Sequence, residues 1–80
     1  MDRNQIFEIV KKYILNQMPN LKPARITESA SLVDDLGADS ANLMMLVMDM
    51  EAEFNMTVED EAISTIRTVG DIVDYIEKRV

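Results

Sequence analysis

Histidine and cysteine are both absent from this chain of 80 residues, and glycine and proline occur only twice each. Without histidine or cysteine, the chain lacks the commonest general base, the thiolate nucleophile and the usual ligands of zinc. It has no cysteine for a disulfide bond and no glycine-rich phosphate loop. A self-sufficient enzyme is therefore disfavoured, and we expect any reactive group to be imported.

Basic residues are also scarce, since 15 acidic and 8 basic side chains leave a net charge of −7. This charge argues against a nucleic acid as the main partner and favours proteins with basic surfaces. The sequence has no apolar stretch long enough to span a membrane, and its start does not resemble a signal peptide. We therefore expect a cytoplasmic monomer that forms a single domain over residues 1–80, with one modest core.

The spacing of apolar residues predicts an all-α fold, a small four-helix bundle with three longer helices and one short helix. The first helix is expected over residues 3–17 and the second over residues 40–54. The short third helix is expected to start near residues 57–60, and the last helix near residue 68. Core positions repeat at three- and four-residue spacing along these helices. They are Ile6, Ile9, Val10, Tyr13 and Ile14 in the first helix, Val58, Ala62, Ile63 and Ile66 around the third, and Val69, Ile72, Val73, Ile76 and Val80 in the last.

Two of the expected helix starts have the spacing of a capping box, in which two residues satisfy each other's free backbone amides. These pairs are Asp2 with Gln5 in the first helix, and Thr68 with Asp71 in the last. Both pairs strengthen the prediction of where these helices begin.

A loop over residues 18–39 separates the first two helices and is long for so small a domain. Pro19 and Pro23 stiffen its first part, because proline restricts the backbone. Five apolar residues are expected to hold the loop against the core. They are Leu21, Ile26, Leu32, Val33 and Leu36. Long ordered loops in compact domains are often functional, and this one leads to Ser40.

Ser40 ends a polar stretch, residues 34–40, and precedes the apolar run of the second helix. Free N–H groups and the positive end of the helix dipole gather at such a helix start, which suits a bound phosphate. Ser40 could instead simply cap the helix, and Asp39 could be the cap or an acid favoured by the dipole. The nearby aspartates do not fit a calcium loop, so no metal site is predicted. A hydrolase that uses Ser40 is disfavoured for want of histidine.

The stretch Asp35-Leu36-Gly37-Ala38-Asp39-Ser40 resembles the modification site of acyl carrier proteins. Two further segments are similar to that family, in the same order along the chain. They are Glu53-Phe54 at the end of the second helix and Thr68-Val69-Gly70-Asp71-Ile72-Val73-Asp74-Tyr75-Ile76 in the last helix. With the helix order and the long first loop, the resemblance covers nearly the whole chain. The form Gly37-Ala38-Asp39-Ser40 is closer to fatty-acid and polyketide carriers than to peptidyl carriers.

The resemblance implies a carrier protein and not an enzyme. Ser40 would bear a covalent 4'-phosphopantetheine arm, transferred from coenzyme A by a phosphopantetheinyl transferase. The arm's thiol would hold acyl intermediates as thioesters and present them to acyl-transferring or acyl-modifying enzymes of a fatty-acid, lipid or polyketide pathway. By the same resemblance, Asp39 belongs to the signal that the transferase reads. We expect the acyl chain to be sheltered between the helices.

The second helix departs from the family on its outer face. Its core face is expected to hold Leu43, Leu46, Val47, Met50 and Phe54. The opposite side holds Ala41, Met44, Met45, Met48 and Ala52. Family members generally carry acids there, which bind basic partner enzymes. Asp49, Glu51 and Glu53 remain on the flanks, and we interpret Asp34, Asp35, Glu51 and Glu53 as solvated charges.

Three roles stay open for Met44, Met45 and Met48: a docking surface for partner proteins, extra core, or a contact between two copies of the chain. If the face docks partners, we expect mainly apolar contact with a hydrophobic groove. The expected partner-binding residues are Asp35, Asp39, Ala41, Met44, Met45, Met48 and Glu51. An alternative function also stays open, namely a carrier-like helical module that binds partners through the methionine face and is never modified.

Overall fold

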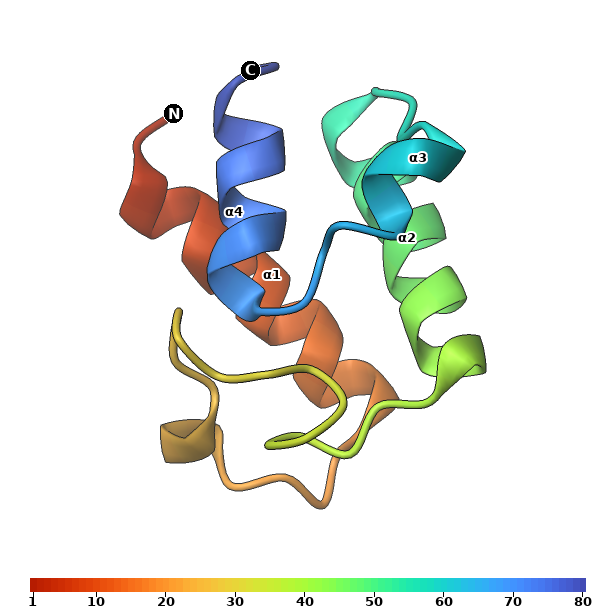
Figure 1. Ribbon diagram of the computed structural model, residues 1–80. Helices are drawn as coiled ribbons and strands as arrows, with labels where there is room; N and C mark the ends of the chain where they lie inside the picture. Colours follow the sequence, from red (N-terminus) through yellow and green to blue (C-terminus); the bar gives the residue numbers. More distant parts are fainter.

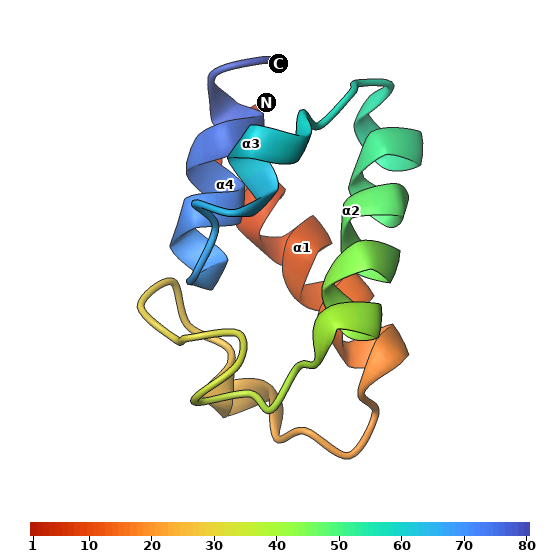
Figure 2. The ribbon, with the colours of Figure 1, turned by 45° about the vertical axis from the view of Figure 1, so that its right-hand side comes forward.

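The computed structural model describes all residues from 1 to 80 and is all-helical (Figure 1). Its elements are α1 (Arg3–Gln17), a single 3₁₀ turn η1 (Pro23–Arg25), α2 (Ser40–Phe54), α3 (Asp60–Ile63) and α4 (Val69–Glu77). The predicted fold, with three longer helices, one short helix and a long first loop, is confirmed. Helix α1 packs against both α4 and α2, and the two chain termini lie at the same end of the molecule (Figures 1 and 2).

The starts of α1 and α4 are held by the two predicted capping boxes. Gln5 N donates to Asp2 Oδ1 at 2.8 Å, and Asp71 N donates to Thr68 Oγ1 at 3.1 Å. Such a cap contributes about 1 kcal/mol to stability. The Asp71 carboxylate also accepts from the backbone amides of Arg67 and Thr68, and these hydrogen bonds lower the pKa of Asp71 below its ordinary value.

One apolar core joins the helices and the first loop. Its fourteen buried residues are Ile6, Val10, Ile14, Ile26, Ala30, Leu32, Leu36, Ala38, Leu46, Met50, Val69, Ile72, Val73 and Ile76. Phe7, Tyr13, Leu21, Leu43, Phe54 and Ile66 are partly buried against it. The loop therefore contributes five core residues of its own, so it is an ordered part of the fold.

Two of the predicted core residues lie at the surface. Val33 is 54% exposed and Val80 is 53% exposed. Val80 follows the end of α4, which stops at Glu77, so it no longer shares the helix's buried stripe. Val33 lies in a tight turn whose backbone closes on itself, with Gly37 N donating to Val33 O at 3.0 Å. In that turn the apolar pattern of the sequence does not follow a helix or a strand, so spacing could not place the side chain.

The first loop is fastened to the start of α4 by backbone hydrogen bonds. Leu32 N donates to Arg67 O at 2.9 Å, and Val69 N donates to Ala30 O at 3.1 Å. Gly70 N donates to Glu28 O at 2.8 Å, and a Cβ atom at Gly70 would lie only 2.9 Å from that same oxygen. Glycine is required at this position because the loop backbone approaches the helix too closely for a side chain.

All ion pairs of the structure meet at Arg3. Its guanidinium contacts Glu28 of the loop, Asp74 of α4 at 2.7 Å and Glu77 of α4 at 3.0 Å. Hydrogen bonds to Glu28 and Asp74 raise the pKa of Arg3 further above its ordinary value. One basic side chain thus connects α1, α4 and the loop at the end of the molecule where the chain termini lie.

Candidate functional site

Ser40 is the first residue of α2, and its side chain is exposed at the end of the first loop. The loop is anchored immediately before it, where Ala38 is buried and its amide donates to Leu32 O at 2.8 Å. Gly37 has a positive φ of 75°, a conformation that glycine adopts easily and other residues rarely. This turn brings the chain from the core to the surface within two residues, so that Asp39 and Ser40 face solvent.

Asp39, and not Ser40, caps α2. Asn42 N donates to Asp39 Oδ1 at 2.8 Å, and Asp39 N donates to Asn42 Oδ1 at 3.0 Å, which completes a third capping box. The interpretation of Ser40 as the cap is therefore wrong. Because Asp39 performs this structural role, the hydroxyl of Ser40 forms no hydrogen bond within the protein and is free to react.

The surroundings of Ser40 suit a phosphate ester. The backbone amides of Ser40 and Ala41 have no partner in the protein, as is usual in the first turn of a helix. These donors and the positive end of the helix dipole favour a negatively charged group at Ser40 Oγ. The exposed hydroxyl leaves room for a bulky attached group, so the residues present fit a phosphodiester-linked cofactor.

Asp34 and Asp35, which precede Ser40, form hydrogen bonds within the first loop. Asp35 Oδ2 accepts from Ser31 N at 2.7 Å, and Arg25 Nη2 donates to the backbone oxygen of Asp35 at 3.2 Å. Asp34 N donates to Ser31 Oγ at 3.0 Å. No group of three or more acidic side chains is placed so that it could hold a metal ion. Asp35 and Asp39 are both exposed and thus also accessible to a partner.

The outer face of α2 is apolar, as the helical spacing predicts. Met44, Met45 and Met48 are 49%, 55% and 61% exposed, and Ala41 and Ala52 are exposed beside them. The interpretation of these three methionines as extra core is wrong for the monomer. On the opposite side of the helix, Leu46 and Met50 are buried, and Leu43, Val47 and Phe54 are half-buried as predicted.

Each acid of α2 has a hydrogen-bond partner inside the domain. Asp49 accepts from Gln17 at 3.3 Å, Glu51 from the backbone amide of Val58 at 2.9 Å, and Glu53 from the hydroxyl of Tyr13. The Tyr13–Glu53 hydrogen bond raises the pKa of Tyr13 above its ordinary value. Glu53 and Asp35 remain exposed and Glu51 is half-buried, so each of these acids combines contact with solvent and a hydrogen bond inside the domain. At the centre of the outer face of α2, a partner would therefore contact only the carbon and sulfur atoms of apolar side chains.

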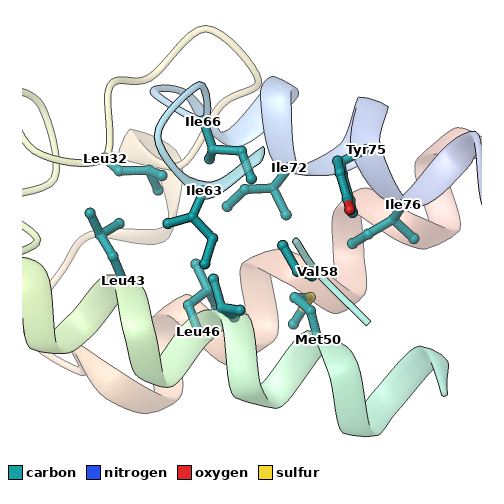
Figure 3. A pocket seen from close by; sticks show the side chains of 11 residues that line it. Leu32, Leu43, Leu46, Met50, Val58, Ile63, Ile66, Ile72, Tyr75 and Ile76 are labelled. Carbon is teal, nitrogen blue, oxygen red and sulfur yellow. The ribbon is translucent and has the colours of Figure 1, made fainter. Parts of the chain in front are cut away.

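A small apolar cavity of about 30 Å³ lies between α2, α3 and α4 (Figure 3). Its eleven lining residues are Leu32, Leu43, Leu46, Val47, Met50, Val58, Ile63, Ile66, Ile72, Tyr75 and Ile76. The sequence predicted a shelter between the helices but not its walls, because residues far apart in the chain form them. An engineered protein cavity of about 150 Å³ is dry and holds benzene. The present cavity is about five times smaller, so a longer apolar group enters only if a wall moves.

Charge is distributed unevenly around this site. No lysine or arginine occurs between Arg25 and Arg67, although this stretch contains ten acids. Residues 26–66 therefore carry a charge of −10, and the rest of the chain carries +3, which together give the net charge of −7. The loop before Ser40, α2 and α3 all belong to the acidic stretch.

Comparison with known proteins agrees with this geometry. Residues 14–76 match the family described as "Phosphopantetheine attachment site". The chain is 49% identical over 78 residues to the acyl carrier protein of Thermotoga maritima, and the aligned region covers 98% of this chain and 95% of the relative. It is 42% identical over 80 residues to the acyl carrier protein of Exiguobacterium sibiricum, with full coverage of both. The structure of the acyl carrier protein from Enterococcus faecalis matches the whole of both chains with a TM-score of 0.82 and 35% identity.

These matches define the chain first as a phosphopantetheine-bearing carrier domain and not an enzyme. More narrowly, the chain belongs to the acyl carrier protein family. Its cofactor is 4'-phosphopantetheine, and it works with enzymes of acyl metabolism. The alternative of a binding module that is never modified is not favoured. No helix has the length and apolar character needed to cross a membrane.

Proposed function

We propose that Ser40 is the residue that bears the arm. The observation that carries this proposal is the division of roles at the start of α2: Asp39 caps the helix, and the Ser40 hydroxyl is exposed and unbonded. Among the exposed serines, Ser64 donates to Glu61 O, and Ser29 lies within hydrogen-bonding distance of Thr27. Only Ser40 combines a free hydroxyl with a helix start.

Ser40 Oγ is then the ester oxygen of the linkage, and the amides of Ser40 and Ala41 hold the phosphate. When bound, the arm supplies a thiol, which this chain lacks, and carries the acyl group as a thioester. The anchored turn at Gly37 and Ala38 keeps the attachment point in a fixed position. Asp39 leaves the hydroxyl free and faces the phosphopantetheinyl transferase, which we take as the first partner.

Intact mass spectrometry tests this assignment. The protein is incubated with coenzyme A and a phosphopantetheinyl transferase, and the mass gained is compared among three proteins. Wild type and Ser29→Ala should each gain one phosphopantetheine group, and Ser40→Ala should remain folded and gain none. Ser29→Ala is the matched control, because it removes an exposed hydroxyl from the same loop. Modification of Ser40→Ala, or none of the wild type, would contradict the proposal.

The cavity between α2, α3 and α4 is the shelter that we propose for the acyl chain. Its lining is apolar throughout, and Leu43 lies one turn of α2 beyond Ser40. Burial of each methylene group contributes about 0.8 kcal/mol, which offsets the displacement of a loosely held wall. Acylated protein should therefore melt at a higher temperature than protein with the free thiol.

We further propose that the methionine face, defined as Ala41, Met44, Met45, Met48 and Ala52, docks enzymes that process the acyl group. Asp39 directly precedes α2 and Glu51 lies on it, so these two acids would contribute at the edge of the face, together with the exposed Asp35 of the loop. The side chains at its centre are apolar, and the acids of α2 are hydrogen-bonded inside the domain. The surrounding stretch has no basic residue. The matching enzyme surface is thus an apolar groove with positive charge at its rim, and flexible methionines suit several such grooves.

Two added charges should distinguish a docking surface from a contact between two copies of the chain. Met44→Glu plus Met48→Glu places them on the methionine face, and Asn4→Glu plus Asn16→Glu places them on exposed positions of α1 as the control. Only the first pair should weaken binding to an acyl-transferring enzyme, with little change in melting temperature. A large loss of stability in the monomer would contradict the exposed position of these methionines. A wild-type dimer that the first pair dissociates would show a contact between copies and would contradict the expected monomer.

A cytoplasmic location remains part of this proposal. This location is supported by the carrier's need for coenzyme A and acyl-processing enzymes in the same compartment. Fractionation of the source cells, followed by detection of the modified protein, would test it.

A further inference from the structure

The two ends of the apolar cavity differ in how their walls are held. Leu32 and Leu43 lie at the end nearer the start of α2, and Met50, Val58 and Tyr75 lie at the far end (Figure 3). The long side between them is covered by Ile63 of α3 and Ile66 beyond it.

The hydrogen bonds of the covering segment, residues 60–66, are all local. Every hydrogen bond made by residues 60–66 stays within that segment or reaches back to Glu59. Helix α3 contains no fully buried residue, and its N-cap has no side-chain hydrogen bond. Ile63 and Ile66 are half-buried. This wall can be displaced without breaking a hydrogen bond to another helix.

The far wall is fastened from two sides. Val58 N donates to Glu51 Oε2 of α2 at 2.9 Å, and Glu59 N donates to the Tyr75 hydroxyl of α4 at 3.3 Å. Arg79 lies over the ring of Tyr75 at 3.5 Å from its centroid and also donates to Tyr75 O. Two consecutive backbone amides are therefore tied to two different helices, at the point where the cavity ends.

We propose that Glu51 and Tyr75 are positioning residues that set the longest acyl chain the carrier shelters. An entering chain displaces α3 sideways and is then stopped by Val58 and Tyr75, which the two hydrogen bonds hold in place. This inference rests on the proposed role of the cavity, and it adds a length limit that a simply deformable cavity would not have.

The dimensions of the cavity give the expected limit. Leu43 and Met50 lie seven residues apart on α2, a rise of about 10 Å at ~1.5 Å per residue. An extended chain advances about 1.2 Å per bond, since three backbone bonds span ~3.5 Å. The sheltered part should therefore be about eight carbons, a chain of medium length.

The test loads the phosphopantetheine-modified protein with saturated acyl groups of increasing length. Two quantities are measured for each: the melting temperature relative to the free thiol, and the rate at which hydroxylamine cleaves the thioester. In wild type, the melting temperature and the protection of the thioester should rise with length and level off near about eight carbons. Glu51→Ala plus Tyr75→Phe should move that plateau to chains at least two carbons longer.

Two further variants make the result specific. Val58→Phe fills the far end and should move the plateau to shorter chains. Tyr13→Phe is the matched control, because it too removes a hydrogen-bonded tyrosine hydroxyl, in this case one that donates to Glu53 outside the cavity. Its plateau should equal that of wild type.

The possible outcomes distinguish the length limit from the proposed acyl shelter on which it rests. A plateau that neither the double variant nor Val58→Phe moves would overturn the role of the far wall and leave the shelter intact. A wild type that no acyl group stabilises or protects would overturn the shelter itself, and the length limit with it.

Discussion

The half of the molecule built from α1, α4 and the first loop differs from the half that contains α2 and α3. In the first half, backbone hydrogen bonds join the loop to α4, and Arg3 links the loop to both helices. Most of the fully buried side chains lie there, among them Ile6, Ile14 and Val73. In the second half, α3 has no fully buried residue and borders a cavity. The proposed shelter for the acyl chain needs both properties, because the fold must persist while one wall is displaced.

The positions of charge follow this division in part, because the acidic stretch contains all of α2 and α3 and also residues 26–39 of the first loop. The well-packed half contains every basic residue, and the stretch from residue 26 to residue 66 contains none. Self-repulsion among acids opposes close packing, and no basic side chain offsets it within α2 or α3. The comparison therefore teaches that stability and function are allotted to different parts of a chain of only 80 residues.

Matched core substitutions in the two halves should show the largest difference. Ile14 of α1 is 1% exposed, whereas Ile63 of α3 is only half-buried. Ile14→Ala should cost about 2–5 kcal/mol in the free energy of unfolding, as buried isoleucines do, and Ile63→Ala should cost about 1 kcal/mol or less. Urea unfolding of both variants measures this. Equal losses would mean that the two halves are not held differently.

Substitution of either glycine by alanine should lower the stability, but for a different physical reason in each case. Gly70→Ala should cost about 1–3 kcal/mol, because its Cβ would lie 2.9 Å from Glu28 O in the well-packed half. Gly37→Ala should cost about 1–2 kcal/mol through its positive φ alone, since no atom lies within 4 Å of the added Cβ.

Asparagine distinguishes the two cases. Asparagine tolerates a positive φ, so Gly37→Asn should recover part of the stability lost in Gly37→Ala, as read from melting curves. Gly70→Asn should be no better than Gly70→Ala. Recovery at Gly70 would contradict the close approach of the loop.

Salt should screen two opposing effects at once, the repulsion among the acids of residues 26–66 and the attraction in the Arg3 ion pairs. Added salt screens the acids of residues 26–66 and should raise the melting temperature of wild type, although it weakens the Arg3 ion pairs. In Arg3→Met those pairs are gone, so this variant should start lower and gain more from the same salt. Calorimetry at increasing sodium chloride measures both slopes. A wild-type melting temperature that falls with salt would show that the ion pairs outweigh the repulsion.

Acid should remove a small contribution from the start of α4. The pKa of Asp71 is lowered in the folded state by hydrogen bonds from the amides of Arg67 and Thr68. Its stabilisation is therefore complete above the ordinary aspartate pKa and is lost as the pH falls through the lowered value. Asp71→Asn should flatten the acid side of the stability curve, measured by unfolding at a series of pH values. An unchanged slope would leave no role for this carboxylate.

Local sequence signals predicted the boundaries of the longer helices well. The spacing of apolar residues placed α1 and α2, and the capping pairs Asp2–Gln5 and Thr68–Asp71 placed the starts of α1 and α4. These signals act between residues three or four apart, so they are present in the sequence before any tertiary contact forms. The same periodicity placed Met44, Met45 and Met48 on the outside.

Other features depended on contacts between distant segments. The cap of α2 was ambiguous because Asp39 and Ser40 are both good capping residues, and only the backbone geometry assigns the role to Asp39. Val33 appeared suited to the core by composition, but the turn around it left it exposed. The hydrogen bond between Glu51 and the Val58 amide could not be predicted, because it depends on the path of the chain after α2.

The sequence by itself determined the helices, the caps of α1 and α4, the exposed apolar face of α2 and the family resemblance around Ser40. Each of these features depends on a short stretch of sequence, in which the helical repeat and the chemistry of neighbouring side chains are enough to predict it. The tertiary structure alone decided that the Ser40 hydroxyl is unbonded, that Gly70 contacts Glu28, and that Glu51 and Tyr75 accept from the amides of Val58 and Glu59. Those features join residues far apart in the chain, and their distances exist only once the helices have packed.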